Sequence, residues 1–326
     1  MAPIPLLRAN ELLEVVRSSI DSSGWSHYIH DAQKPFGLFL ERPGRERVDI
    51  RVFIWNCTHG GGSARAADEF RIQFTKTVPR YYPEETTLLL GWHDGYGVFA
   101  AWNIGMHQGQ DSGSPSAQIR EEVLRAAYND GFAVGERGNG EIVAAFKPEL
   151  FAEYAANAES IHNGRIQDLD ILNNLSNIDF GQTFRQGSRR MVSSTIIRAY
   201  REVSFSKRVL AAYSSRCAVC GIQLRLIEAA HIVPVAVPES TDLTCNGIAL
   251  CALHHKAYDS NLLSVAEDYS VQLSMEKLDG LRSANLSGGI DNFVNNLQQH
   301  ISLPADRRDF PSRENLVLSR RVRGWR

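Results

Sequence analysis

Four residues in the C-terminal half have the types and the spacing of a metal site. Cys217 and Cys220 are separated by two residues, which suits a tight turn that directs both thiolates at one ion. Cys251 and His254 repeat the same spacing. Structural zinc sites use four such ligands in a tetrahedron, so these residues predict a structural Zn2+ site. Gly221 follows the first pair and suits a knuckle that requires a positive φ.

The residues between and after these ligands predict a strand, a second extended segment and a helix. Residues 225–235 are apolar with few turn signals and predict a strand, and residues 238–246 predict a loop or a short strand. Residues 250–259 predict a helix, in which His255 and Asp259 lie one turn apart on the same face.

The order His231, Asn246 and His255 after a Cys-x-x-Cys pair resembles the HNH nucleases, whose active site is a ββα-metal unit. The resemblance implies cleavage of phosphodiester bonds. It implies that His231 is the general base, that the Asn246 side chain orients the imidazole of His231, and that His255 binds a catalytic divalent cation, Mg2+ or Mn2+. Asp259, one helical turn on, is the expected second ligand of that cation.

Two positions depart from the pattern of that family. Most relatives carry a cysteine where this chain has His254, and many have a metal-binding Asp or His directly before the base, where this chain has Ala230. The cation must then be held by fewer protein groups, by water and DNA phosphate, or by Glu228, which shares a strand face with Ala230.

A basic stretch leads into this motif. Residues 185–225 contain nine basic residues and one acidic residue, although the net charge of the whole chain is only -2. Clusters of this kind neutralise phosphate groups, and the alternative is a solvated helix face. Six of these side chains are expected to bind DNA: Arg189, Arg190, Arg198, Arg201, Lys207 and Arg208.

The length and composition predict two packed domains in a reducing compartment. The chain has 326 residues, of which 43% are hydrophobic. Five cysteines are too few for a disulfide framework, and Cys57 and Cys245 remain outside the zinc site. No apolar run is long enough to span a bilayer, and no secretory signal is recognisable at the start. A cytoplasmic location without membrane contact is expected.

The N-terminal half predicts an α+β domain built on a curved antiparallel or mixed sheet. The expected elements are helices at 1–20, 116–129 and 147–160, a strand at 48–55, and hairpins at 86–102 and 132–146. The half is also rich in tryptophan. Its four tryptophans are Trp25, Trp55, Trp92 and Trp102. Most of these rings are expected in the core, and one or two have the chemistry to stack on a flipped base.

The chain therefore predicts an α+β protein with a recognition domain at 1–163, a helical connector at 164–195 and an HNH nuclease domain at 196–326. The expected function is that of a restriction-type endonuclease on double-stranded DNA, directed by its first domain to modified DNA. A single-site nuclease needs two copies to cut both strands, so a homodimer is expected.

Three other functions are consistent with the same residues. The first is a sequence-specific restriction enzyme for unmodified DNA. The second is a zinc-stabilised nucleic-acid-binding module with an inactive nuclease site, which Ala230 favours and the intact His231, Asn246 and His255 disfavour. The third is an RNA nuclease, because the chemistry of the motif is the same for both nucleic acids.

Overall fold

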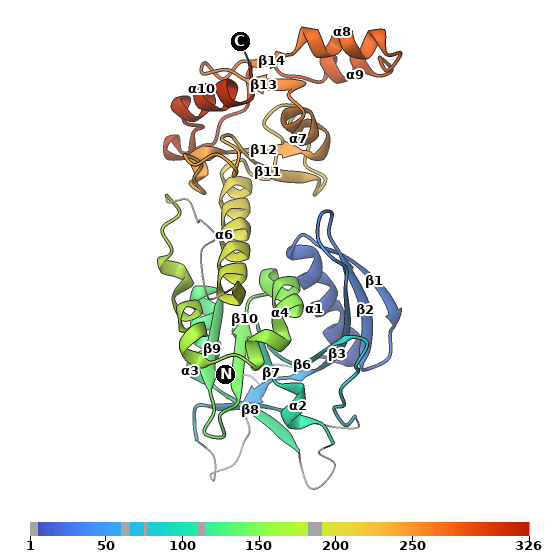
Figure 1. Ribbon diagram of the computed structural model, residues 1–326, viewed down its shortest axis with the longest axis vertical. Helices are drawn as coiled ribbons and strands as arrows, with labels where there is room; N and C mark the ends of the chain where they lie inside the picture. The colour runs from blue at the N-terminus through green and yellow to red at the C-terminus, as the bar shows by residue number, and fades with distance from the viewer. Residues whose placement is uncertain (1–5, 60–65, 75–76, 110–114, 182–190, 326) are drawn as a thin grey trace. The chain divides into compact units, whose positions relative to one another are not determined.

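A computed structural model describes residues 6–59, 66–74, 77–109, 115–181 and 191–325. The chain forms two compact units (Figure 1). The first consists of residues 1–178 and 186–200, and the second of residues 179–185 and 201–326. Within the described ranges, no helix combines the length and the apolar character needed to cross a membrane.

A mixed seven-stranded sheet forms the centre of the first unit. Its strands, in spatial order, are β1 (Ser26–Asp31), β2 (Phe36–Glu41), β3 (Val48–Asn56), β6 (Thr86–His93), β7 (Val98–Trp102), β10 (Ile142–Phe146) and β9 (Phe132–Glu136). Only the β3–β6 pair of this sheet is parallel. A second sheet contains β4 (Thr58–His59), β5 (Glu69–Gln73) and β8 (Ser116–Arg120). The large sheet is thus mixed, which is one of the two forms that the sequence predicted.

Both faces of the central strands of the large sheet are buried. Alternate residues of β3 belong to different cores: Ile50, Val52 and Ile54 pack with the helices α1 (Ala9–Ser22) and α4 (Phe151–His162). Phe53 and Trp55 point to the other face and pack with the small sheet and α3 (Glu121–Asp130). Burial on both faces explains why this strand is a nearly continuous apolar run.

Most of the elements expected in this unit are present, with one correction. The two hairpins form as β6–β7 and β9–β10. The helix expected from residue 116 begins only at Glu121, because Ser116–Arg120 pairs with β5 as strand β8. Ala117 and Ile119 alternate into the core there, a period of two that overrides the helical pattern. The unit also contains α2 (Ile104–His107), η1 (Pro148–Leu150), α5 (Ile166–Leu169) and η2 (Asp170–Asn177).

The second unit is built around a two-stranded sheet covered by helices. Helix α6 (Met191–Ala212) starts in the first unit and ends in the second. After it come β11 (Ile227–His231), η3 (Thr244–Asn246), β12 (Gly247–Cys251), α7 (Ala252–Asp259), β13 (Leu263–Val265), β14 (Val271–Leu273), α8 (Met275–Ser283), α9 (Ile290–Asn295), η4 (Arg307–Asp309) and α10 (Arg313–Val322). Phe205 and Val209 of α6 pack with Ile248 and Leu250 of β12 and with Leu316 of α10 in one core.

The strand, strand and helix expected in this unit form, with a shift of one boundary. The second strand is β12, which pairs antiparallel with β11 and runs from Gly247 to Cys251. It therefore follows the segment 238–246 and takes the first two residues of the helix expected at 250–259. All five residues of β12 are buried, so their apolar run has no periodicity that separates a strand from a helix start.

Candidate active site and metal centre

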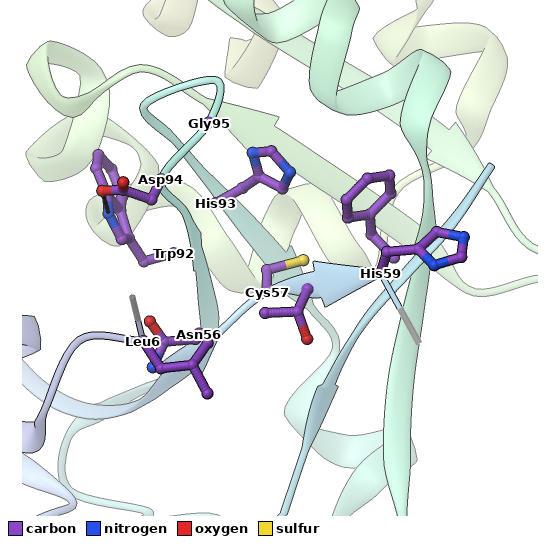
Figure 2. Close-up of a pocket in the computed structure, with 10 residues that line it drawn as sticks. Leu6, Asn56, Cys57, His59, Trp92, His93, Asp94 and Gly95 are labelled. Atoms are coloured by element: carbon purple, nitrogen blue, oxygen red, sulfur yellow. Dashed lines mark hydrogen bonds between the residues drawn. The ribbon is translucent and has the colours of Figure 1, made fainter. Parts of the chain in front are cut away.

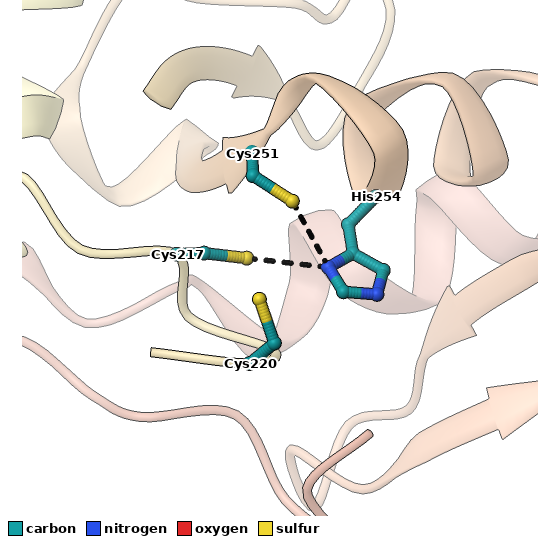
Figure 3. Close-up of side chains that lie close together, drawn as sticks. All are labelled: Cys217, Cys220, Cys251 and His254. Atoms are coloured by element: carbon teal, nitrogen blue, oxygen red, sulfur yellow. Dashed lines mark hydrogen bonds between the residues drawn. The ribbon is translucent and has the colours of Figure 1, made fainter. Parts of the chain in front are cut away.

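The four expected zinc ligands converge on one point of the second unit (Figure 3). Their ligand atoms all lie within 4.8 Å of one another. The Nδ1 atom of His254 lies 3.5 Å from Sγ of Cys217 and 3.2 Å from Sγ of Cys251. Gly221 has a φ of 75°, which allows the turn after Cys220 to close with a hydrogen bond from the Gly221 amide to the Cys217 carbonyl.

The chemistry of this cluster fits zinc. Burial opposes ionisation of Cys217, but the hydrogen bond from His254 and those from backbone amides lower its pKa to about 6. Cys217 is thus the thiol most readily available as the thiolate, the form that binds metal, while burial raises the pKa of Cys220 and of Cys251. Nδ1 of His254 faces the sulfur atoms, while its buried Nε2 has no hydrogen-bond partner among the described residues. The donor set matches a closed tetrahedral site with no open position.

His231 lies at the C-terminal end of β11, opposite Gly247 of β12. Its imidazole stacks on Phe205 of α6, with ring centroids 3.8 Å apart and planes 12° apart. The close approach of α6 to β12 explains why position 247 is a glycine. A Cβ atom at position 247 would lie 2.3 Å from a methyl group of Val209 and 3.0 Å from the Phe205 ring. The packing of α6 on the sheet thus fixes the plane of the His231 ring.

Asp242 fixes the tautomer of that ring in its neutral form. Its Oδ1 lies 3.0 Å from Nε2 of His231, and its Oδ2 accepts a hydrogen bond of 2.7 Å from Nε of Arg201. Burial alone would raise the pKa of Asp242, but the hydrogen bond with His231 and the charge of Arg201 outweigh it and lower the pKa below its usual value. An ionised carboxylate only accepts, so Nε2 of His231 carries the hydrogen and Nδ1 of the neutral ring has a free lone pair.

The Asn246 side chain lies next to the His231 site without bonding to the imidazole itself. It is fully buried, and its Oδ1 accepts a hydrogen bond from the Val233 amide while its Nδ2 donates one to the Thr241 carbonyl. Among the described residues, no hydrogen bond joins the Asn246 side chain to His231. Asn246 instead ties together both ends of the loop that carries Asp242, so it positions the imidazole indirectly.

His255 lies on α7 between two carboxylates. Its Nδ1 is 2.5 Å from Oε2 of Glu228, on β11, and its Nε2 is 3.5 Å from Oδ2 of Asp259. The side chains of Glu228 and Asp259 are 56% and 53% exposed, so this row of three groups opens to solvent. Imidazole and carboxylate groups suit a divalent cation that also keeps water ligands. The two carboxylates face different nitrogens of the ring, so an ion bound here would take His255 together with one of them.

The structure keeps some of the expected residues apart. In the described residues, only the cysteine–histidine cluster brings three or more ligand atoms together, and no contact joins His231 to His255. Ala230 stands where many HNH relatives have a metal-binding Asp or His. It is 1% exposed and packs in the core of the unit, so this position faces apolar side chains.

Comparison with known proteins agrees with this geometry. A family model described as HNH endonuclease matches residues 217–266, which contain all four cluster ligands together with His231, Asn246 and His255. These residues form an HNH endonuclease domain. The protein is therefore a nuclease. A second family model, described as Methylase-associated X1, matches residues 48–155 of the first unit.

Other comparisons add little to the HNH assignment. No curated protein matches the chain in sequence. Among solved structures, a chain titled "Modification dependent TagI restriction endonuclease" matches 79% of this chain and 76% of its own length, at 10% identity and a TM-score of 0.30. A score of this size does not establish a common fold.

The basic residues that precede the HNH domain have different surroundings. Arg201 is buried and holds Asp242, and Nη2 of Arg208 donates a hydrogen bond of 2.6 Å to the Asp242 carbonyl. Both side chains therefore brace the Asp242 loop. Arg198 and Lys207 are exposed on α6. Arg189 and Arg190 lie outside the described residues.

Two residues of the site were not anticipated from the sequence, namely Asp242 and Phe205. Asp242 lies in a segment without periodicity, and Phe205 looks like any core residue of an amphipathic helix. One pattern in the sequence could have indicated Phe205 and an acidic partner for the two arginines beside it. Arg201, Phe205 and Arg208 are spaced at i, i+4 and i+7, which places two cations and a ring on one helix face beside the HNH motif.

Proposed function

We propose that the protein is a metal-dependent DNA endonuclease of the restriction type, in which residues 196–326 cut and residues 1–163 direct cutting to modified DNA. Residues 164–195 would connect the two. The observation that carries this proposal is the pairing of His231 with Asp242 inside an HNH domain, because it leaves Nδ1 of His231 as a base that can take a proton from water.

The residues divide the work of phosphodiester hydrolysis as follows. Asp242, Phe205 and Arg201 hold the imidazole of His231, which accepts the proton of the attacking water at Nδ1. His255 and Asp259, with Glu228 beside them, would hold Mg2+ or Mn2+, which supplies positive charge to the phosphate in the transition state. The Zn2+ of the cysteine–histidine cluster would be structural, since its four ligands leave no open position.

The preference for modified DNA rests on the first unit. The family that matches residues 48–155 is described as associated with methylases, which add the commonest modifications of DNA bases. A nuclease domain in the same chain as such a domain is consistent with an enzyme that distinguishes modified from unmodified DNA sites. Cleavage of both strands by one HNH domain per chain requires two copies, so we also propose a homodimer on DNA.

The proposal is tested by digestion of one plasmid grown in modifying and in non-modifying hosts, with added Mg2+ or Mn2+ and with EDTA. We expect the wild-type protein to cut only the modified plasmid and only with the metal. We expect His231→Ala to bind DNA but not cut it, because the base acts in the transition state.

Other outcomes of the digestion identify other functions. Equal cutting of both plasmids at fixed sites would indicate an ordinary restriction enzyme. Cutting of RNA alone would indicate a ribonuclease. Binding without any cutting by the wild-type protein would indicate an inactive module.

A further inference from the structure

The first unit has a cavity of about 260 Å³ that the nuclease chemistry does not use (Figure 2). It lies where the β6–β7 turn meets β4 and β5, and its wall includes Phe70, Trp92, His93 and Asp94. Pockets for drug-sized ligands have volumes of about 300–1,000 Å³, so this cavity suits a smaller molecule, about the size of a single heterocyclic base.

The wall of the cavity is aromatic and apolar on most sides. Leu6, Cys57, Phe70 and Trp92 supply apolar surface, and the rings of Phe70 and His93 meet edge to face at 4.8 Å. In Figure 2, His59 lies on the opposite side of Cys57 from Trp92 and Asp94. Surfaces of this kind bind flat rings, because every nucleobase presents a π face to an aromatic side chain.

The polar groups of the wall select among flat rings. None of the described residues that line the cavity is a lysine or an arginine, and the carboxylate of Asp94 is the charged group among them. This part of the wall therefore favours a hydrogen-bond donor over an anion. Oδ1 of Asp94 accepts a hydrogen bond from Nε1 of Trp92 at 3.2 Å, which fixes the carboxylate and leaves Oδ2 to accept another.

His93 offers the complementary group. Its Nδ1 accepts a hydrogen bond of 3.0 Å from the Tyr96 amide, so the hydrogen of the neutral ring resides on Nε2. Burial lowers the pKa of His93, which keeps the ring neutral. No described residue accepts a hydrogen bond from Nε2. The cavity thus combines an acceptor on Asp94 with a donor on His93.

We infer that this cavity binds a nucleobase that carries an exocyclic amino group, with the amino group donating to Asp94 and a ring nitrogen or carbonyl accepting from His93. Cytosine and adenine have this pattern, whereas uracil and hypoxanthine present a carbonyl in place of the amino group. The inference rests on the proposed function, in which the base is one turned out of a DNA duplex. A free nucleoside has the same chemistry.

The test uses the full-length His231→Ala protein, so that DNA is bound and not cut. Fluorescence anisotropy at fixed salt compares duplexes that differ only in one base placed opposite an abasic site, where little pairing energy opposes eversion. The bases are cytosine, 5-methylcytosine and uracil, and adenine, N6-methyladenine and hypoxanthine. A parallel titration uses the free nucleosides cytidine, adenosine, uridine and inosine.

We expect an amino-bearing base to be bound about tenfold more tightly than its carbonyl counterpart. The added substitution Asp94→Asn keeps an oxygen for Trp92 but removes the charge, and we expect it to abolish that preference. Phe70→Leu should weaken binding of every base. Glu46→Gln, at an exposed acidic residue away from the cavity, serves as the control and should leave binding unchanged.

The outcomes separate this inference from the proposed function. A preference for modified DNA that survives Asp94→Asn and Phe70→Leu would overturn the inference and leave the function intact. Binding of cytidine or adenosine, lost in Asp94→Asn, without any preference among duplexes would support the cavity and remove recognition of modified DNA. Equal binding of amino and carbonyl bases in both titrations would overturn the inference.

Discussion

Two neighbouring histidines at the start of α7 have opposite surroundings. His254 is 2% exposed, and its Nδ1 faces the thiols of Cys217 and Cys251. The side chain of His255 is 22% exposed and lies between the half-exposed carboxylates of Glu228 and Asp259. One short helix therefore directs one imidazole into a closed cluster and the next into an open row.

On the proposed function, this difference distinguishes a site that stabilises the fold from a site that acts on the substrate. The closed cluster has four ligands assembled around one point, so a metal there contributes free energy to folding. The open row has fewer protein ligands and leaves room for water and phosphate, as a catalytic cation requires. The substitutions below test this division, beginning with the largest expected effect.

The largest effect is expected at the closed cluster. Cys217→Ser should lose bound zinc and unfold the second unit, because zinc binding in small domains contributes about 10–16 kcal/mol to folding. Metal analysis and circular dichroism measure the loss, and the first unit should remain folded because its two cores contain none of these ligands. Cys245→Ser, in the same unit but outside the cluster, is the control. Folded wild-type protein without zinc would refute the assignment.

The next effect is expected at the open row. His255→Ala should abolish cleavage or raise the Mg2+ concentration it requires by about 10- to 100-fold, while zinc content and folding stay unchanged. Asp259→Ala should act in the same direction. Titration of cleavage rate against Mg2+ measures both, with His300→Ala and Glu267→Ala as exposed controls in the same unit. An unchanged requirement in Asp259→Ala would move the second ligand to Glu228 or to water.

A smaller effect is expected from the group that holds the base. Asp242→Asn should slow cleavage by about 10- to 100-fold without changing the Mg2+ requirement, because it acts on His231 and not on the cation. Single-turnover rates at saturating DNA measure this. Asn246→Ala should also slow cleavage but lower the melting temperature as well, since it leaves buried backbone groups of Val233 and Thr241 unpaired. A changed Mg2+ requirement in Asp242→Asn would show that the His231–Asp242 pair and the row around His255 act as one site.

The smallest effect is expected at two exposed basic residues of α6. Arg198→Ala and Lys207→Ala should each weaken DNA binding about equally for all sequences and reduce the slope of log affinity against log salt by about 1. Binding isotherms at several salt concentrations measure the slope. Arg201→Ala should instead impair cleavage, because Arg201 holds Asp242. An unchanged slope in both exposed variants would show that neither side chain contacts phosphate.

The sequence predicted those parts of the site whose geometry is local. Cys217 and Cys220 share one turn, and Cys251 and His254 share the start of one helix, so their spacing already determines how they point. The role of Asp242 depends on a loop whose shape is set by the buried amide of Asn246. No pattern in the sequence of the loop predicts the hydrogen bonds from Asn246 that set its shape.

The same distinction applies to the fold. Hairpins such as β6–β7 were predictable because their strands are neighbours in sequence. The parallel pairing of β3 with β6 joins Ile50 to Thr86 and the residues after them, and no local signal specifies such a distant partner. The strand β8 was misread as the start of a helix because its pairing with β5 likewise lies far away in the sequence.

The presence of His254 has an electrostatic consequence. Three thiolates and a neutral imidazole give a zinc complex one negative charge fewer than four thiolates would. The next residue of the helix, His255, belongs to the row where DNA phosphate would arrive. Phosphate therefore meets less repulsion from the structural centre, and this matters because that repulsion extends about 8 Å at physiological ionic strength. The substitution His254→Cys would keep four metal ligands but add a negative charge next to His255.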